Sequence, residues 1–266
     1  MPEGDTVFRA ASTLHRALAG EVIRSSDLRV PRLALVDLSG QEVGEVASVG
    51  KHLLLRTDGG WTLRSHLRME GSWHLYRPGE RWRGPDHQVR AVLVTDPWVA
   101  VGFRLAMLEL VRTSSEDNVV GHLGPDLLSE LWDPHEAVRR LLLRPERPIG
   151  EALLDQRNLA GIGNLYRNEV LFLRGVNPWT PVGAVADLEG LVELARRLLQ
   201  LNTRHWTQAT TGDTKGERHW VFERQRGACL RCGTAIEVAR QGPPPKARLT
   251  YWCPSCQATR AWTAGG

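Results

Sequence analysis

The stretch Asp155–Leu171, DQRNLAGIGNLYRNEVL, decides how the second half of the chain folds. It lies in a segment, residues 149–173, that two glycines, Gly161 and Gly163, interrupt. Glycine disfavours a helix interior because it loses much conformational freedom when its backbone is fixed, and paired glycines are typical of turns. We therefore predict two short helices that are joined by a turn.

Helical periodicity continues on both sides of this stretch. Apolar residues recur about every 3.6 positions, which is the period of an α-helix with one buried face. They predict one helix around Ala137, Val138, Leu141 and Leu142, and a second helix around Leu188, Leu191, Val192, Ala195, Leu198 and Leu199. Residues 206–217 are rich in Thr, Gly and charge with few apolar anchors, so they predict a mobile loop.

The first half of the chain has a different pattern. Val7, Ala10, Ala11, Leu14 and Leu18 predict a helix that stops at Gly20. Short apolar runs separated by Gly, Pro and Asp then predict antiparallel strands of a sandwich or barrel, at residues 42–49, 52–57, 61–67 and 89–95. The expected fold class is therefore α+β with several domains. Their expected extents are a β-sandwich domain at 1–112, a linker at 113–124, a helical domain at 125–206, and a mobile loop with a cysteine hairpin at 207–266.

All four cysteines fall into one arrangement, Cys229-x2-Cys232 and Cys253-x2-Cys256. A CxxC turn directs two thiolates at one point, and two such turns complete a closed tetrahedral zinc site. Disulfides or free thiols are the alternatives, but no cysteine is left over. We predict one structural zinc ion, with Gly242–Pro245 at the tip of a hairpin. The basic residues of this hairpin could touch phosphates, and they are Arg240, Lys246, Arg248 and Arg260.

The net charge of +4 is unevenly distributed. Residues 207–266 carry nine Lys or Arg and four Asp or Glu, a balance of +5, whereas the rest of the chain has a balance of −1. Such asymmetry indicates a polyanionic partner, although a merely solvated tail would have the same composition. No apolar run is long enough for a membrane helix, and the N-terminus does not resemble a signal peptide. We expect a cytoplasmic protein without a membrane partner.

The N-terminus, Met1-Pro2-Glu3-Gly4, is a second candidate site, because it could supply a nucleophilic amine. Proline at this position permits removal of the initiator methionine, which would leave a secondary amine. The ordinary pKa of an α-amino group is about 7.7–8.0, so part of it is neutral and nucleophilic at physiological pH. Glu3 beside it could transfer a proton. Taken alone, these residues are also compatible with an ordinary frayed terminus.

Three stretches together resemble the Fpg/Nei family of DNA glycosylases. The opening Met1-Pro2-Glu3-Gly4 looks like the endonuclease VIII branch, and Asp155–Leu171 is similar to the helix–two-turn–helix of the family. The third stretch resembles its zinc finger, and it consists of Val221–Arg224 leading into Cys229 and of Arg248-x4-Cys253-Pro-x-Cys256. The fold implied by the resemblance is a β-sandwich, then helices and a zinc finger.

The resemblance implies catalytic roles for three residues. Pro2 would be the nucleophile that forms a Schiff base at the sugar C1′, and Glu3 would be the general acid and base. Lys51, in Val49-Gly50-Lys51-His52, matches a lysine that contacts phosphate and assists proton transfer. Without the resemblance, Lys51 would be interpreted as an exposed hairpin lysine.

The same resemblance implies DNA contacts. Asn164 and Arg248 would bind the phosphates that flank the lesion, and Met69 would fill the space left by the flipped base, where ordinary core packing is the alternative. Two positions depart from the family pattern: Thr6 stands where many members carry a glutamate, and Asp5 where a proline is common.

The expected function is that of a bifunctional glycosylase and AP lyase of base excision repair. It would remove oxidised bases, pyrimidines in preference, and cleave the strand by β/δ-elimination. A formamidopyrimidine/8-oxoguanine glycosylase, favoured by the Met69 motif, is the first alternative. A catalytically silent DNA-binding protein of the same fold and a zinc-ribbon RNA-binding or transcription protein are the others. The expected partner is damaged DNA, duplex or single-stranded, and we expect a monomer associated with the nucleoid.

Overall fold

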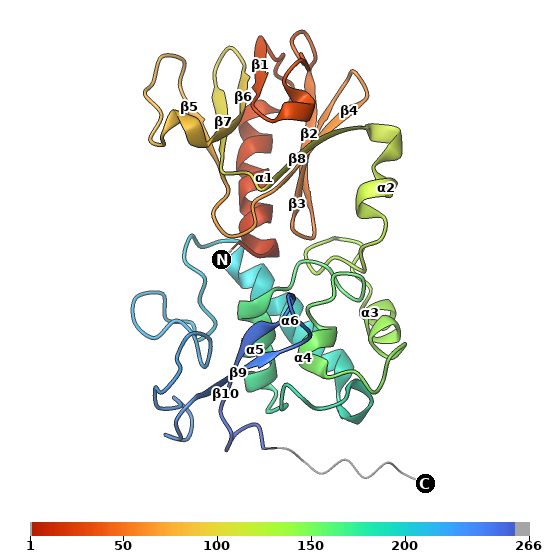
Figure 1. Ribbon diagram of the computed structural model, residues 1–266, viewed down its shortest axis with the longest axis vertical. Helices are drawn as coiled ribbons and strands as arrows, with labels where there is room; N and C mark the ends of the chain where they lie inside the picture. The colour runs from red at the N-terminus through yellow and green to blue at the C-terminus, as the bar shows by residue number, and fades with distance from the viewer. Residues whose placement is uncertain (1, 259–266) are drawn as a thin grey trace. The chain divides into compact units, whose positions relative to one another are not determined.

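The computed structural model describes residues 2–258 of the chain (Figure 1). The backbone forms two units, which divide between His122 and Leu123. They are called unit 1 and unit 2 below. Arg260, which was expected to lie on the cysteine hairpin, is outside the described residues. No helix in the described range is both long and apolar enough to cross a membrane.

Unit 1 begins with α1 (Gly4–Leu18), whose apolar residues face inward as predicted from their spacing. Two four-stranded antiparallel sheets follow, with strand orders β2-β3-β4-β8 and β1-β6-β7-β5. The strands are β1 (Ser25–Leu28), β2 (Val43–Val49), β3 (His52–Thr57), β4 (Trp61–His66), β5 (Ser72–Tyr76), β6 (Val89–Val94), β7 (Val99–Phe103) and β8 (Met107–Arg112). Short 3-10 turns occur at η1 (Pro31–Leu33) and η2 (Asp86–Gln88).

One hydrophobic core joins α1 to both sheets. It contains Val7 and Leu14 of α1, Leu55 and Leu63 of one sheet, and Leu93 of the other. Burial of such side chains contributes about 1.5–3 kcal/mol each relative to full exposure. α1 packs on β2 and β3, and it also touches β5, so both sheets hold its position (Figure 1). The prediction of one helix followed by an antiparallel sandwich is confirmed.

The stretch expected to be a linker, residues 113–124, carries secondary structure of its own. It contains η3 (Thr113–Ser115) and α2 (Asp117–Val120). Between them, Glu116 accepts two hydrogen bonds from the guanidinium of Arg56 in β3, each 2.7 Å long. A bidentate pair of this kind fixes orientation as well as distance. The start of this stretch is therefore attached to the first sheet.

Unit 2 is mainly helical, with α3 (Pro134–Leu141), α4 (Ile149–Ala152), α5 (Asn164–Leu173), η4 (Val182–Ala184) and α6 (Leu188–Asn202). The predicted apolar stripe of α6 is buried, and α6 packs against α3 and α5. Asp133 and Asp187 cap α3 and α6, because each side chain accepts a hydrogen bond from a backbone N–H of the first turn. The two short helices expected around Gly161 are α4 and α5. One detail differs: α3 ends at Leu141, and Leu142 is 44% exposed.

The cysteine-bearing end of the described chain folds as the predicted hairpin. Strand β9 (Glu237–Gln241) pairs with β10 (Arg248–Trp252) in an antiparallel register that sets Arg248 opposite Gln241. The proline-rich residues 242–247 connect the two strands, and a CxxC turn lies on each side of the hairpin in the sequence. β10 also packs against α5, so the hairpin is part of the core of unit 2.

Candidate functional sites

Pro2 and Glu3 lie immediately before the first turn of α1. Glu3 is the N-cap residue, and its backbone carbonyl accepts hydrogen bonds from the N–H groups of Thr6 and Val7 at 3.0 and 3.1 Å. The residue is fully buried, whereas Pro2 is half-buried. The positive end of the helix dipole stabilises a carboxylate at this position. A buried carboxyl group thus stands next to a more accessible proline.

Asp5 is a second fully buried carboxyl residue in the first turn of α1. It stands where a proline is common in the family, and the family pattern assigns it no role. Thr6, which replaces the usual glutamate, is half-buried, and its hydroxyl accepts a hydrogen bond from Arg9 at 3.4 Å. The start of α1 therefore has two buried acidic residues, Glu3 at the N-cap and Asp5 in the first turn, in spite of the threonine. An aspartate two residues after the glutamate was the only signal for this in the sequence.

Lys51 occupies the two-residue turn between β2 and β3. Val49 pairs with His52 across this turn, and Gly50 adopts φ +59°, a left-handed conformation that glycine allows without strain. Lys51 is half-buried rather than fully exposed. Because α1 packs on both strands of this hairpin, the fold fixes the hairpin against the helix that Pro2 and Glu3 precede.

Two histidines lie beside Lys51 and were not singled out by sequence reasoning. His52 and His66 are direct cross-strand partners on β3 and β4, with ring centroids 5.0 Å apart. Burial, followed by the charge of Arg64, lowers the pKa of His52 to about 3. Burial, followed by the charge of Lys51, lowers the pKa of His66 to about 4. Both imidazoles are therefore neutral at physiological pH.

Hydrogen bonds fix the orientation of both rings. Arg64 donates from Nε to Nδ1 of His52 at 3.2 Å and from Nη1 to Glu109 at 3.0 Å. The backbone N–H of Arg68 donates to Nδ1 of His66 at 3.0 Å. An Nδ1 that accepts a hydrogen bond leaves the proton of a neutral imidazole on Nε2, so His66 can act as a donor through Nε2. Only the strand register brings this pair together.

Met69 lies in the turn between β4 and β5 and is 65% exposed. The neighbouring Arg68 has φ +49°, and the backbone N–H of Gly71 closes the turn on the carbonyl of Leu67 at 2.9 Å. A methionine this exposed is not packed in the core. It is instead displayed on a tight turn that starts directly after His66.

Asn164 and Arg248, the two expected phosphate contacts of unit 2, lie close together. Asn164 is the first residue of α5, and its side-chain amide donates to the backbone carbonyl of Leu249 at 2.9 Å. Leu249 follows Arg248 at the start of β10. Arg248 is exposed, while Gly161, in the turn before α5, has φ +101°, which favours glycine. The pair forms a polar edge at the start of α5.

Arg167 supports this edge from inside the molecule. It is fully buried, and its Nη2 donates to the side-chain oxygen of Asn164 at 2.6 Å and to the hydroxyl of Thr250 at 2.9 Å. Its Nη1 donates to the side-chain oxygen of Gln241 in β9 at 2.9 Å. Arg167 thus joins α5 to both strands of the hairpin. A buried arginine in a helix is not predictable from apolar periodicity, because long charged side chains are mostly exposed.

The four cysteine sulfurs lie within 4.8 Å of one another. The Sγ atoms of Cys229 and Cys256 are 3.9 Å apart, and those of Cys232 and Cys253 are 3.5 Å apart. Four thiolates at about 2.3 Å from a tetrahedral zinc ion would be about 3.8 Å from each other. These residues therefore fit a closed four-sulfur metal site without an open coordination position.

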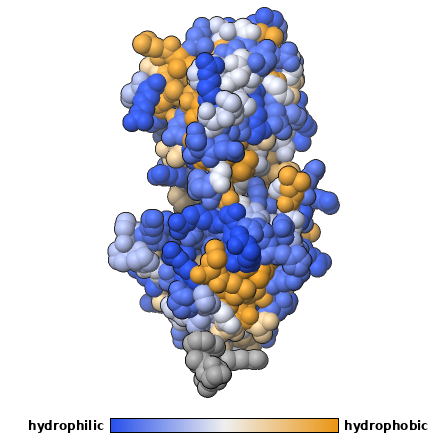
Figure 2. Space-filling model, turned by 90° about the vertical axis from the view of Figure 1, so that its right-hand side faces the viewer, coloured by the Kyte–Doolittle hydropathy of each residue, from blue (hydrophilic) through white to orange (hydrophobic). Residues whose placement is uncertain are grey.

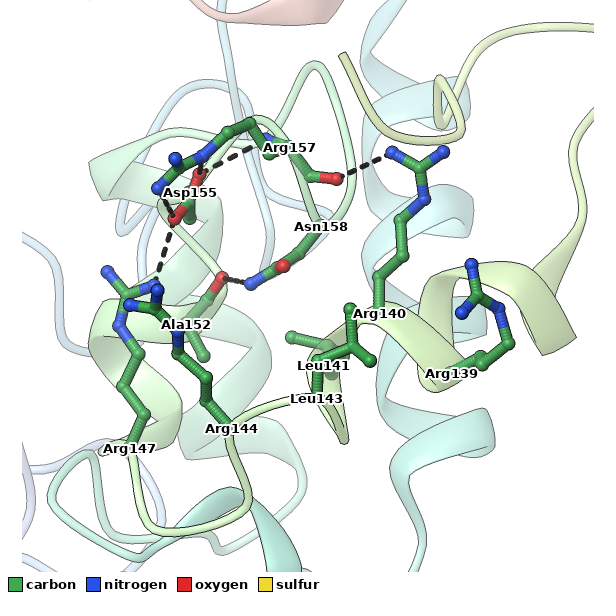
Figure 3. A pocket seen from close by; sticks show the side chains of 10 residues that line it. All are labelled: Arg139, Arg140, Leu141, Leu143, Arg144, Arg147, Ala152, Asp155, Arg157 and Asn158. Carbon is green, nitrogen blue, oxygen red and sulfur yellow. Dashed lines mark hydrogen bonds and ion pairs between the residues drawn. The ribbon is translucent and has the colours of Figure 1, made fainter. Parts of the chain in front are cut away.

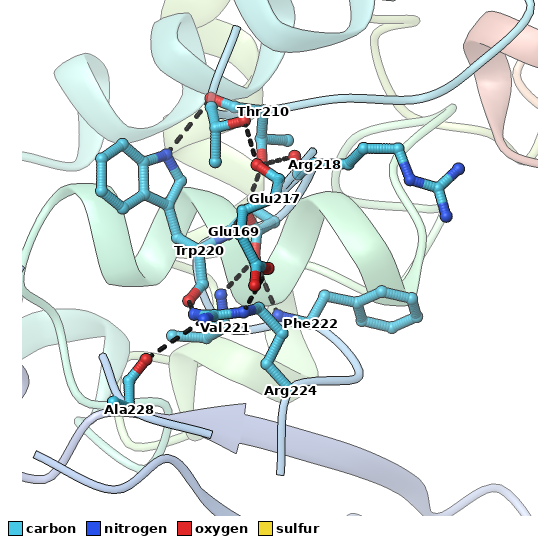
Figure 4. Close-up of polar contacts among 10 residues, drawn as sticks. Glu169, Thr210, Glu217, Arg218, Trp220, Val221, Phe222, Arg224 and Ala228 are labelled. Carbon is cyan, nitrogen blue, oxygen red and sulfur yellow. Dashed lines mark hydrogen bonds and ion pairs between the residues drawn. The ribbon is translucent and has the colours of Figure 1, made fainter. Parts of the chain in front are cut away.

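Glu169 attaches the segment that precedes the first CxxC turn to α5 (Figure 4). Its buried carboxylate accepts hydrogen bonds from the backbone N–H groups of Trp220, Val221 and Phe222 at 2.8–2.9 Å, and from the hydroxyl of Thr210. Three N–H donors satisfy a carboxylate that burial would otherwise make costly. Residues 206–217, the expected loop, contain no helix or strand, and this contact attaches them to α5 at Thr210.

Two family models match the chain. The formamidopyrimidine-DNA glycosylase N-terminal domain matches residues 1–107, and the formamidopyrimidine-DNA glycosylase H2TH domain matches residues 123–202. The chain is 54% identical to a Streptomyces coelicolor protein named probable endonuclease 8 2, over 100% of this chain and 97% of that protein. It is 46% identical to the DNA-(apurinic or apyrimidinic site) lyase Nei2 of Mycolicibacterium smegmatis, over 97% of this chain and 99% of that protein.

Solved structures share the fold. The formamidopyrimidine-DNA glycosylase of Lactococcus lactis, bound non-covalently to DNA with an AP site, superimposes with a TM-score of 0.80 at 23% identity. The similarity covers 97% of this chain and 100% of that chain. Matches to both halves of the chain agree with the sandwich, the helical turn and the cysteine hairpin described above. The chain therefore belongs to the Fpg/Nei family of DNA glycosylases and AP lyases, on its endonuclease VIII branch.

Proposed function

We propose that this chain excises oxidised bases from DNA and cleaves the strand, with Pro2 as the nucleophile. The observation that carries this proposal is the fully buried Glu3 at the start of α1, next to a more accessible Pro2. Once Met1 is removed, the secondary amine of Pro2 attacks C1′ of the damaged nucleotide, and the bond between C1′ and the base breaks. Opening of the sugar ring, which breaks the bond between C1′ and the ring oxygen, then leaves the sugar attached to Pro2 as a cationic iminium.

Glu3 provides the proton transfers of this sequence. As an acid it protonates the ring oxygen of the sugar, and as a base it can take the proton back. The iminium withdraws electrons from the sugar, which acidifies the C2′ hydrogens. Loss of a C2′ proton expels the 3′ phosphate, and a second elimination expels the 5′ phosphate. Water then hydrolyses the iminium and regenerates the amine of Pro2.

Lys51 acts as a phosphate contact that also assists proton transfer. Its neighbours His52 and His66 are neutral, since burial lowers the pKa of both imidazoles. Neutral histidines spare Lys51 the repulsion of two further cations. Nε2–H of His66 remains available as a donor to the same phosphate group.

Asn164 and Arg248 hold the phosphates that flank the lesion. Their proximity through Leu249 supports a shared role, because one exposed cation and one amide lie at the N-terminus of α5, where anions are favoured. Met69 fills the gap left when the damaged nucleotide leaves the stack, and its exposure supports this role. One zinc ion bound by the four cysteines orders the hairpin and takes no part in the chemistry.

The proposed substrates are oxidised pyrimidines in damaged DNA, duplex or single-stranded, bound by a monomer. The Gly4-bearing N-terminus and the relatives named endonuclease 8 support this preference. The Met69 motif favours the alternative, a formamidopyrimidine/8-oxoguanine glycosylase. A panel of single-lesion oligonucleotides separates the two, with excision measured in single turnovers. Faster release of thymine glycol or 5-hydroxyuracil than of 8-oxoguanine is expected, and the reverse order would favour the alternative.

A further inference from the structure

A cavity of about 320 Å³ opens on unit 2, between the end of α3 and the segment that follows α4 (Figure 3). Its lining includes one carboxylate, Asp155, and five arginines: Arg139, Arg140, Arg144, Arg147 and Arg157. None of these residues is among the phosphate contacts proposed above. The cavity is thus a concentration of positive charge that the proposed function leaves unused.

The carboxylates of the described residues only partly neutralise these arginines. Arg147 and Arg157 share Asp155, at 2.9 and 2.7 Å. Arg139 and Arg140 share Glu136 of α3 in the same way, at 2.6 Å each.

Arg144 remains. Its side chain makes no ion pair or hydrogen bond among residues 2–258. In Figure 3 the guanidinium groups of Arg144 and Arg147 lie beside each other. Two like charges side by side repel, and an anion that binds both would relieve this repulsion.

The mouth of the cavity is apolar as well as basic. Leu143 lines it and is 67% exposed, and the adjacent Leu142 is 44% exposed. On the face drawn in Figure 2, an apolar area of unit 2 lies among hydrophilic residues. Exposed leucines beside a cationic cavity favour a ligand that has both carboxylates and an apolar group. A DNA backbone offers phosphates but no apolar side chain.

The location of the cavity also argues against a contact with the same DNA. Asn164 and Arg248 lie where α5 meets β10. The residues that line the cavity all lie between positions 139 and 158, so neither Asn164 nor any residue of the β9–β10 hairpin is among them. The basic hairpin and the arginine cavity are therefore separate features of this unit.

We propose that this cavity binds an acidic peptide segment of a partner protein. Carboxylates of the peptide pair with Arg144 and Arg147, and a neighbouring apolar side chain packs on Leu143. Such a contact would bring the enzyme to a protein without occupying its DNA-binding residues. The mode combines bidentate arginine–carboxylate pairing with a small apolar anchor.

Fluorescence anisotropy of the full-length protein with a labelled peptide, Asp-Asp-Asp-Asp-Leu-Phe, tests the proposal. Arg144→Glu should weaken binding about tenfold or more, a change of about 1.4 kcal/mol or more. Arg197→Glu reverses an exposed arginine of α6 that does not line the cavity, and it should change affinity less than about twofold, as a remote surface charge does. Leu143→Ser should weaken binding of this peptide but not of Asp-Asp-Asp-Asp-Ala-Ala. Incision of abasic-site DNA by Arg144→Glu should equal that of the wild type.

Three outcomes would overturn the proposal. The first is absence of peptide binding by the wild type at millimolar concentration. The second is equal weakening by Arg144→Glu and Arg197→Glu, which would reveal a general charge effect. The third is displacement of the peptide by undamaged duplex together with a loss of duplex affinity in Arg144→Glu, which would make the cavity a DNA contact. Because the peptide assay does not depend on catalysis, its failure is distinguishable from failure of the glycosylase proposal.

Discussion

The side-chain amide of Asn164 donates to the backbone carbonyl of Leu249, 2.9 Å away, and so joins the start of α5 to the start of β10. The buried Arg167 reinforces this junction, because its Nη2 donates to the same carbonyl at 3.1 Å. Arg248, the residue before Leu249, therefore lies near Asn164, although Asn164 begins α5 and Arg248 begins the second strand of the cysteine hairpin. We interpret the two residues as one phosphate-binding edge.

The charge difference between these two residues leads to a salt-dependence prediction. Arg248→Ala should weaken binding to damaged and undamaged duplex alike. It should reduce the slope of log affinity against log salt by about 0.9, as expected for one lost phosphate contact. Asn164→Ala should weaken binding while leaving the slope almost unchanged, because asparagine is neutral. Arg197→Ala, on α6, is the matched control and should change neither quantity.

An altered lesion preference in Arg248→Ala, with the wild-type salt slope, would contradict this interpretation. Such a result would make Arg248 a reader of the damaged base and not a phosphate contact. Titrations over a range of salt concentrations, with one lesion-bearing and one undamaged duplex, are sufficient for the comparison.

Replacement of Glu3 tests the acid–base step. Glu3→Gln should bind lesion DNA as tightly as the wild type but release the base about 10²–10⁴-fold more slowly, because glutamine cannot supply a proton. Asp5→Asn is the informative control, since Asp5 is equally buried in the same turn. We expect it to retain base excision. If Asp5→Asn lost excision in single turnovers while Glu3→Gln kept it, the general acid would be Asp5.

The sequence predicts the long elements well because apolar periodicity reports directly on burial. The stripes of α1 and α6 and four strands of the sandwich, β2, β3, β4 and β6, follow from it, whereas β1, β5, β7 and β8 were not predicted. Leu142 was expected on the buried face of α3, but that helix ends one residue earlier. The reason is local: after Leu141 the chain turns away, and periodicity alone does not mark where a helix stops.

The site is less predictable because it depends on pairing between distant residues. His52 and His66 meet only through the register of β3 and β4, which no single strand specifies. The hydrogen-bond acceptors of the buried Arg167 are neutral and come from two strands far along the chain. The sequence of its own helix therefore does not indicate that this arginine is buried. The cysteines are the exception, since the CxxC spacing itself encodes their convergence.

The buried His52 and the half-buried His66 predict a pH dependence of stability. Their pKa values are about 3 and about 4 in the folded protein, below the ordinary value of 6.5. The unfolded chain therefore binds more protons, and the stability contributed by the neutral imidazoles is present above about pH 6.5 and lost as the pH falls towards 4. Each histidine can contribute at most about 1.4 kcal/mol per pH unit, and less in practice because both rings retain some contact with water.

Thermal or urea unfolding between pH 7 and pH 5 measures this effect before most carboxylates titrate. The wild type should lose stability across this interval, and His52→Gln should lose less because one titrating group is gone. If the free energy of unfolding fell by the same amount in both proteins between pH 7 and pH 5, His52 would not be the group that causes the pH dependence.

Metal removal tests the role of the cysteine hairpin. We expect one zinc ion per chain, and its removal by a chelator should disorder β9 and β10 and so abolish DNA binding, because a structural zinc site supplies folding free energy. Cys232→Ser should behave like the metal-free protein. Ser255→Ala, in the second CxxC turn between Cys253 and Cys256 but without loss of a thiolate, should bind zinc and DNA normally. Normal DNA affinity in a metal-free preparation would contradict a structural role for the metal.

The most direct test of the central claim is borohydride trapping on DNA that contains an abasic site. Borohydride reduces an iminium to a stable amine, so the protein should become covalently attached to the strand through the nitrogen of Pro2. Pro2→Gly should lose most of this product, and a tag that blocks the N-terminus should abolish it. Lys51→Arg, which keeps the charge, should still be trapped. Undiminished trapping of the N-terminally blocked protein would contradict the assignment of Pro2 as the nucleophile.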